Sequence, residues 1–94
     1  MKGNFPVIVG TTAIQAVNYD KERSSLIIFN NSGTATVYYG FDNTLTATNG
    51  VPIPPRSGLS FSRQSGDDAR IAMWLVASAV STDVRVGEGR LEAA

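Results

Sequence analysis

The sequence contains neither cysteine nor histidine among its 94 residues. Without cysteine the chain can form no disulfide and offers no thiol nucleophile. Without histidine it lacks the commonest general base at neutral pH. With both residue types missing, a zinc or other transition-metal site is not expected, and the carboxylates show no EF-hand-like spacing for calcium. We therefore predict no metal and no cofactor.

Charge is scarce and balanced. Eight basic and eight acidic residues give a net charge of zero, and charged residues make up 17% of the chain. A binder of duplex nucleic acid needs concentrated Lys and Arg, so no nucleic-acid partner is expected. No apolar run approaches the ~20 residues of a membrane span, and MKGNFPVIVGTTA does not have the pattern of a signal peptide. We expect cytoplasmic synthesis and no membrane partner.

What the sequence does contain is typical of β-structure. Val, Ile, Thr, Ser, Tyr and Phe dominate, and Gly and Pro recur between the apolar runs. The pattern predicts an all-β fold, a single small β-sandwich or jelly-roll-like domain of about six to seven antiparallel strands. Beyond an extended piece at 5–10, the expected strands are 13–18, 24–30, 35–41, 59–63, 69–79 and 83–87. The stretch DARIAMWLVASAV, residues 68–80, is the one place where a short helix is the alternative.

The chain is short enough for one domain over residues 1–94. Residues 1–12 are expected to form an extended amino-terminal arm or an edge strand, and residues 13–88 the β core. An arm there could add a strand to a neighbour's sheet. Residues 89–94 are expected to be a loose tail.

Carboxylates are the last enzymatic option in a chain without histidine or cysteine. Asp67 and Asp68 are adjacent and follow Ser65-Gly66, and Asp42 precedes Asn43. Both settings are typical of solvated turns, and nothing supplies a tuned acid–base pair. We predict that the protein is not an enzyme and has no catalytic residue.

The aromatic and proline residues suggest contact surfaces. Tyr38 and Tyr39 must point to opposite faces of a strand, so that one joins the core and the other is free to anchor a protein contact or to stack on a sugar. An ordinary cross-strand aromatic pair is the favoured interpretation of these residues, and the contact surface is the alternative. The proline segment, residues 51–55, is stiff and suits a docking edge. The candidate interface residues are Phe5, Pro6, Val7, Tyr38, Val51, Pro52, Ile53, Pro54 and Pro55.

Four stretches, ERSSLIIFNNSG, VYYGFDN, TNGVPIPPRSGLSF and VRVGE, follow one another over residues 20–88. Their layout resembles small virion proteins of tailed bacteriophages, and capsid decoration (cement) proteins in particular. The positions that carry the resemblance are Arg23, Ser24, Asn30, Asn31, Gly40, Asn49, Gly50, Pro52, Val84 and Val86.

The resemblance implies a structural protein on the capsid surface of the virion. Its partner would be the major capsid protein, whose neighbouring subunits it would bridge as a trimer or dimer. Physically, such a clamp needs a stiff β core and many copies rather than a catalyst. A carbohydrate- or receptor-binding β-module of a head fibre or tail tip is the alternative, motivated by Tyr38, Tyr39 and Trp74. A head–tail joining protein is a weaker alternative, and a small hydrolase weaker still.

Overall fold

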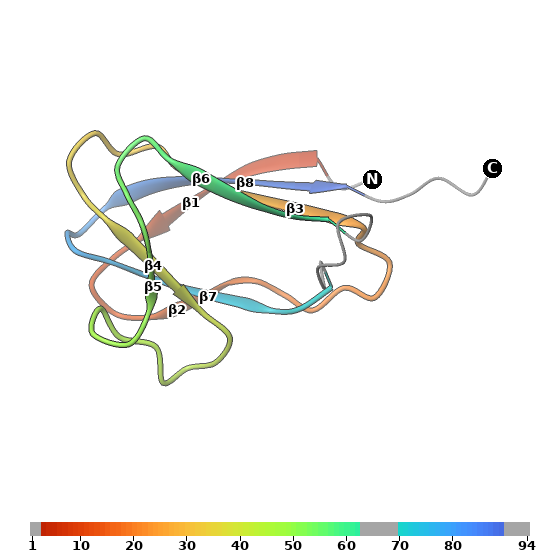
Figure 1. Cartoon of the computed structure of the whole chain (residues 1–94), viewed down its shortest axis with the longest axis horizontal. Helices are drawn as coiled ribbons and strands as arrows, with labels where there is room; N and C mark the ends of the chain where they lie inside the picture. The colour runs from red at the N-terminus through yellow and green to blue at the C-terminus, as the bar shows by residue number, and fades with distance from the viewer. Residues whose placement is uncertain (1–2, 63–69, 90–94) are drawn as a thin grey trace.

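The computed structural model describes residues 3–62 and 70–89, and every regular element in these residues is a β-strand (Figure 1). The all-β prediction is confirmed. None of the described residues belongs to a helix long and apolar enough to cross a membrane. The strands are β1 (Gly3–Val9), β2 (Ile14–Val17), β3 (Ser25–Asn30), β4 (Val37–Gly40), β5 (Val51–Ile53), β6 (Gly58–Ser62), β7 (Met73–Ala77) and β8 (Thr82–Gly89).

The strands form two four-stranded antiparallel sheets, which Figure 1 shows as an upper and a lower layer. One sheet has the order β1-β8-β3-β6 and the other the order β2-β7-β4-β5. The first strand pairs with the last, the second with the seventh, the third with the sixth and the fourth with the fifth. This nested pairing, folded into two sheets, is the topology of a jelly roll.

Alternation along each strand decides what lies between the sheets. In β3, Leu26 and Ile28 are fully buried while Ile27 between them is 51% exposed. In β8, Val84 and Val86 are buried in the same way. The core combines side chains of both sheets: Val9, Val17, Leu26, Ile28, Val37, Ile53, Met73, Leu75, Ala77, Val84 and Val86.

Most expected strand boundaries shift by one or two residues, and three differences are larger or change an assignment. The proline segment contributes β5, which brings the number of strands to eight. β7 begins at Met73 rather than at position 69, because residues 70–72 form a turn and bend before it. Gly89 ends β8, where it pairs with Ser25, so it belongs to the core and not to a tail.

The amino-terminal stretch is an edge strand rather than a free arm. β1 pairs with β8 over its whole length, from Gly3 opposite Glu88 to Val9 opposite Thr82. Pro6 lies in the middle of this strand, and a proline is tolerated where its nitrogen faces the unpaired edge. The strand is therefore hydrogen-bonded to β8 within its own sheet and is not free as an extended arm.

Candidate functional site

The titratable side chains of the described residues do not gather into a reactive site. No group of three or more carboxylates among residues 3–62 and 70–89 could hold a metal ion. Asp42 accepts hydrogen bonds from the amide and the hydroxyl of Thr44, which lower the pKa of its carboxyl. That arrangement closes a turn and leaves the carboxylate ionised. Asp67 and Asp68 lie outside the described residues.

A buried ion pair joins the two sheets at one end of the sandwich. Arg23 Nη1 lies 2.6 Å from Glu88 Oε2, and the two side chains are only 1% and 7% exposed. Arg23 also donates to the carbonyl of Asn18, just after β2, and to the carbonyl of Ile71, just before β7. One guanidinium thus ties β8 of one sheet to the ends of two strands of the other, which a planar group with five donors is suited to do.

A buried side-chain amide also links the two sheets, at the opposite end of β3. Asn30 is fully buried, and its Nδ2 donates to the carbonyls of Ala35, Ile53 and Pro54 at 2.8–3.2 Å. Its Oδ1 accepts from the amide of Ser32. Every polar atom of this side chain therefore has a partner, which removes the cost of burying it. Arg23 and Asn30, two of the positions that carry the resemblance to virion proteins, therefore link the two sheets through buried contacts.

The outer face of the β1-β8-β3-β6 sheet carries an open apolar groove. Paired positions place Pro6, Arg85 and Phe29 in one row across the sheet, and Asn4, Gly87 and Ile27 in the next. These residues line a groove of about 440 Å³, shared with the edges of Phe5 and Val86. We call this surface the open face. The main apolar residues of the open face are Ile27 and Phe29 from β3 and Pro6 from β1.

Polar side chains border the open face in a connected series. Asp83 lies 2.9 Å from Arg85 Nη2 and accepts a hydrogen bond from Asn31, which in turn accepts one from Arg56. The bonds from Arg85 and Asn31 lower the pKa of the Asp83 carboxyl. Two guanidinium groups and one carboxylate leave this border with a net positive charge.

The outer face of the β2-β7-β4-β5 sheet is covered by the chain itself, and we call it the covered face. Residues 42–50, between β4 and β5, turn back so that Leu45 is 7% exposed. Tyr38 and Val76 face this side as paired neighbours, and Val76 is buried although it points away from the core. Asn49 shapes the loop, since its Oδ1 accepts from the amide of Thr46 and its Nδ2 donates to the carbonyl of Thr44.

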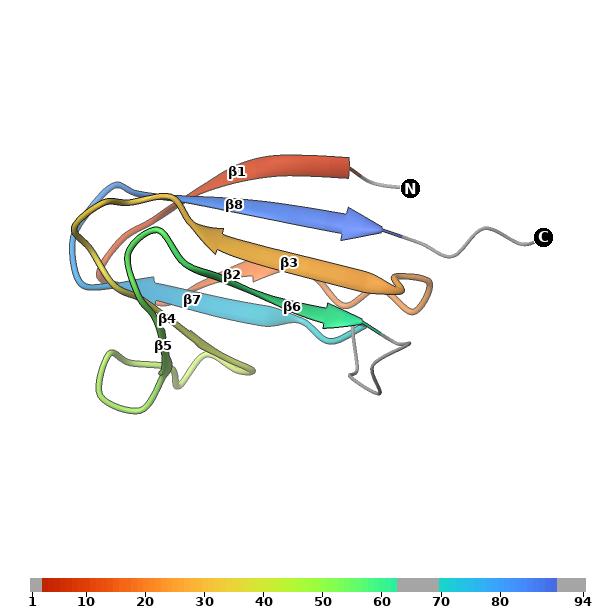
Figure 2. The same cartoon turned by 45° about the horizontal axis from the view of Figure 1, so that its top comes forward.

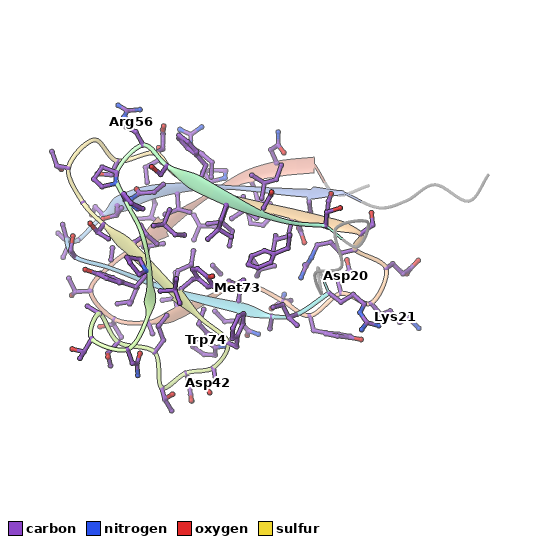
Figure 3. The ribbon with its side chains drawn as sticks, in the orientation of Figure 1. Asp20, Lys21, Asp42, Arg56, Met73 and Trp74 are labelled. Carbon is purple, nitrogen blue, oxygen red and sulfur yellow. The ribbon has the colours of Figure 1, made fainter. Side chains whose placement is uncertain are left out.

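Trp74 lies on the covered face beside this loop. Figure 3 shows Met73 pointing between the layers and its neighbour Trp74 pointing outward, toward the turn that carries Asp42. Trp74 is partly exposed and forms the wall of a hollow of about 330 Å³ between two connections of the chain, residues 11–13 and 43–47. The residues that line this Trp74 hollow are Thr11, Thr12, Ala13, Asn43, Leu45, Thr46, Ala47, Trp74 and Val76.

The structure separates the nine predicted interface residues into two groups. Phe5, Pro6 and Val7 lie in β1, at the edge of one sheet. The others lie in or just after β5, at the edge of the other sheet, except Tyr38, which lies in the neighbouring inner strand β4. Figure 2 shows β1 along the top of the molecule and β5 at the bottom. The two groups therefore form no common surface in one copy of the chain.

Several of these side chains do not reach the surface fully. Ile53 is 2% exposed and belongs to the core, and Phe5 and Val7 pack against the core. Tyr39 also packs inward, with its ring edge-on to Phe41 and Phe61, so the opposite orientation of Tyr38 and Tyr39 is confirmed. The exposed members are Pro6, Val51, Pro52 and Pro54.

Sequence reasoning passed over Ile27, Phe29 and Leu45. A signal for the first two existed, because Ile27 and Phe29 are the out-of-phase members of SLIIFN and must face away from the core. The signal for Leu45 was its position as the only large apolar residue in DNTLTATNG.

The chain matches no protein-family model, no curated protein and no solved structure.

Proposed function

We propose that the protein is a structural component of a tailed-phage particle, a decoration protein that binds the outer capsid and bridges neighbouring subunits. The observation that supports this proposal most directly is the open face. It presents the exposed Ile27 and Pro6 and the partly buried Phe29 around an open groove. An apolar groove with a polar border is a common arrangement for a protein contact.

The partner surface can be described by its chemistry. The groove accepts an apolar ridge of a shell subunit, and the positively charged border formed by Arg56, Asp83 and Arg85 favours acidic side chains beside that ridge. A shell repeats this contact many times, so single contacts need only modest affinity. The jelly-roll topology agrees with this role by analogy, since viral capsid domains use it, although a fold alone does not determine a function.

The experiment compares two matched aspartate substitutions. We expect wild-type protein to sediment with emptied heads of the phage that encodes it, and Ile27→Asp to remain in the supernatant, because a charge at the centre of the contact is left unpaired. Val80→Asp is the control, since Val80 is 73% exposed and lies after β7, away from the groove. Circular dichroism should show that both variants are folded.

Two results would contradict the proposal. One is the absence of the protein from purified particles of its phage. The other is equal sedimentation of the Ile27→Asp and wild-type proteins. Light scattering on a sizing column then tests the expected trimer or dimer, because a subunit that spans two capsid proteins is more effective when its copies are linked.

A further inference from the structure

The Trp74 hollow is a second surface with the character of a binding site. It lies on the covered face, so it points away from anything bound to the open face on the other side of the sandwich. Its volume, about 330 Å³, is at the lower end of the range of small-molecule sites, and it combines one aromatic wall with several polar groups. It has no part in the docking proposed above.

We propose that the Trp74 hollow binds one ring of a neutral saccharide. The apolar surface of the hollow suits one face of a sugar ring. The partly exposed indole of Trp74 stands beside Leu45 and Val76, which are buried by the loop and supply a dry background. A sugar ring has one face made largely of C–H groups and an edge of hydroxyls, and a flat aromatic side chain matches the C–H face.

The polar rim of the hollow offers hydrogen-bonding groups that are open to a ligand. The side chains of Thr11, Thr12 and Asn43 make no hydrogen bond within residues 3–62 and 70–89. The hydroxyl oxygen of Thr46 accepts from two amides, of Thr48 and Asn49, which leaves its proton to donate. Hydroxyl and amide groups donate and accept alike, and so do the hydroxyls of a sugar.

The lining of the hollow carries no charge. All nine residues that line the hollow are uncharged. The carboxylate of Asp42, next to Asn43 in the chain, is engaged by Thr44. A phosphate, a sulfate or an acidic sugar would find no counter-charge here and would lose hydration without compensation. The chemistry of the hollow thus selects a neutral, hydroxylated ligand.

The experiment uses the fluorescence of the intact chain, because Trp74 is its only tryptophan. The probes are methyl glycosides of glucose, galactose, mannose and N-acetylglucosamine, together with their neutral oligosaccharides. We expect a saturable change in indole emission with at least one of them, with a Kd on the order of 1 mM for a single ring of about a dozen heavy atoms. Added salt should leave this affinity unchanged, because no charge takes part.

Two variants keep the fluorophore and test the rim. Asn43→Ala and Thr12→Val change exposed side chains, so both should fold, and each should weaken binding about two- to tenfold through the loss of one hydrogen bond. Thr34→Val is the matched control, because Thr34 is also exposed but lies between β3 and β4, outside the hollow. Its affinity should equal that of the wild type.

Three results would overturn the inference. The first is a flat titration with every neutral saccharide, supported by an empty array of neutral glycans. The second is wild-type affinity in both rim variants. The third is tighter binding of glucuronate or a sulfated sugar than of any neutral one. Binding to emptied heads is measured separately, so failure here leaves the docking proposal standing, and the reverse also holds.

Discussion

Outward-facing apolar side chains are buried on the covered face but remain exposed on the open face. On the covered face, Val76 points away from the core and is nevertheless buried, because Leu45 and its loop lie over it. On the open face, Ile27 occupies a comparable central position and stays half exposed. The comparison shows that an outward-facing side chain on a sheet is not necessarily exposed for binding, because a loop of the same chain can bury it.

Small residues make the difference possible on both faces. A Cβ on Gly40 or Gly50 would come within 2.9 or 2.7 Å of the Leu45 Cδ1 atom, so these two glycines admit the loop. On the open face, a Cβ on Gly87 would come within 2.9 Å of Asn4 Oδ1, so this glycine admits the side chain of Asn4 from the neighbouring strand. The missing side chains therefore admit a whole loop on the covered face and a single side chain on the open face.

The largest expected effect comes from the interior that both faces share. Arg23→Met should lower the free energy of unfolding by about 3–5 kcal/mol, because it leaves the carboxylate of Glu88 buried without its partner. Urea denaturation followed by circular dichroism measures this change. Because Arg23→Met destabilises the interior behind both faces, the two faces should be compared in variants that retain the Arg23–Glu88 pair.

A double substitution separates the buried charge from the loss of packing. Arg23→Met combined with Glu88→Met should recover much of the lost stability, since no charge is then left buried. A double variant as unstable as Arg23→Met alone would instead assign the effect to the hydrogen bonds that Arg23 donates to Asn18 and Ile71.

The next effect sharpens the contrast between the faces. Leu45→Ala should cost about 2–3 kcal/mol of unfolding free energy, because it removes a buried side chain from the covered face. Ile27→Ala on the open face should cost less than about 1 kcal/mol, as expected for a half-exposed position. Equal costs in denaturant titrations would mean that both faces are equally covered in solution.

The smallest effect depends on pH and concerns one aspartate bordering each face. Hydrogen bonds from Arg85 and Asn31 lower the pKa of Asp83, and bonds from Thr44 lower that of Asp42, both from 3.8. A lowered carboxyl pKa gives stability that is present above the unfolded value and is lost as the pH falls through the folded one. Asp83→Asn and Asp42→Asn should each flatten the acid limb below pH 3.8, as measured by thermal melts. An unchanged slope in both variants would show that neither carboxylate contributes.

The sequence predicts the sandwich well because alternation is a local property. SLIIFN and VRVGE assign their inward side chains from neighbours alone, and the same phase marks Asn30 and Glu88 as inward-facing polar residues. A polar group in the core phase implies a buried partner, so part of the interior network could have been found before the structure.

The partner of Arg23 and the surfaces were harder to predict, because they depend on non-local contacts. Arg23 precedes β3, and only the fold brings Glu88, 65 residues later, within reach of it. Trp74 faces outward by alternation, but the hollow beside it exists only because residues 11–13 and 43–47 meet there. The proline segment was judged by stiffness alone, and its Ile53 proved to be a core residue.

The place of β8 between β1 and β3 has a consequence for how the protein is made. Both neighbours of this strand are synthesised long before it, and until Thr82–Gly89 has left the ribosome neither of them has its central partner. Until then β1 has no partner in its sheet and β3 can pair only with β6, a state that exposes the nascent chain to aggregation. The four-stranded sheet is complete only when β8 inserts between β1 and β3.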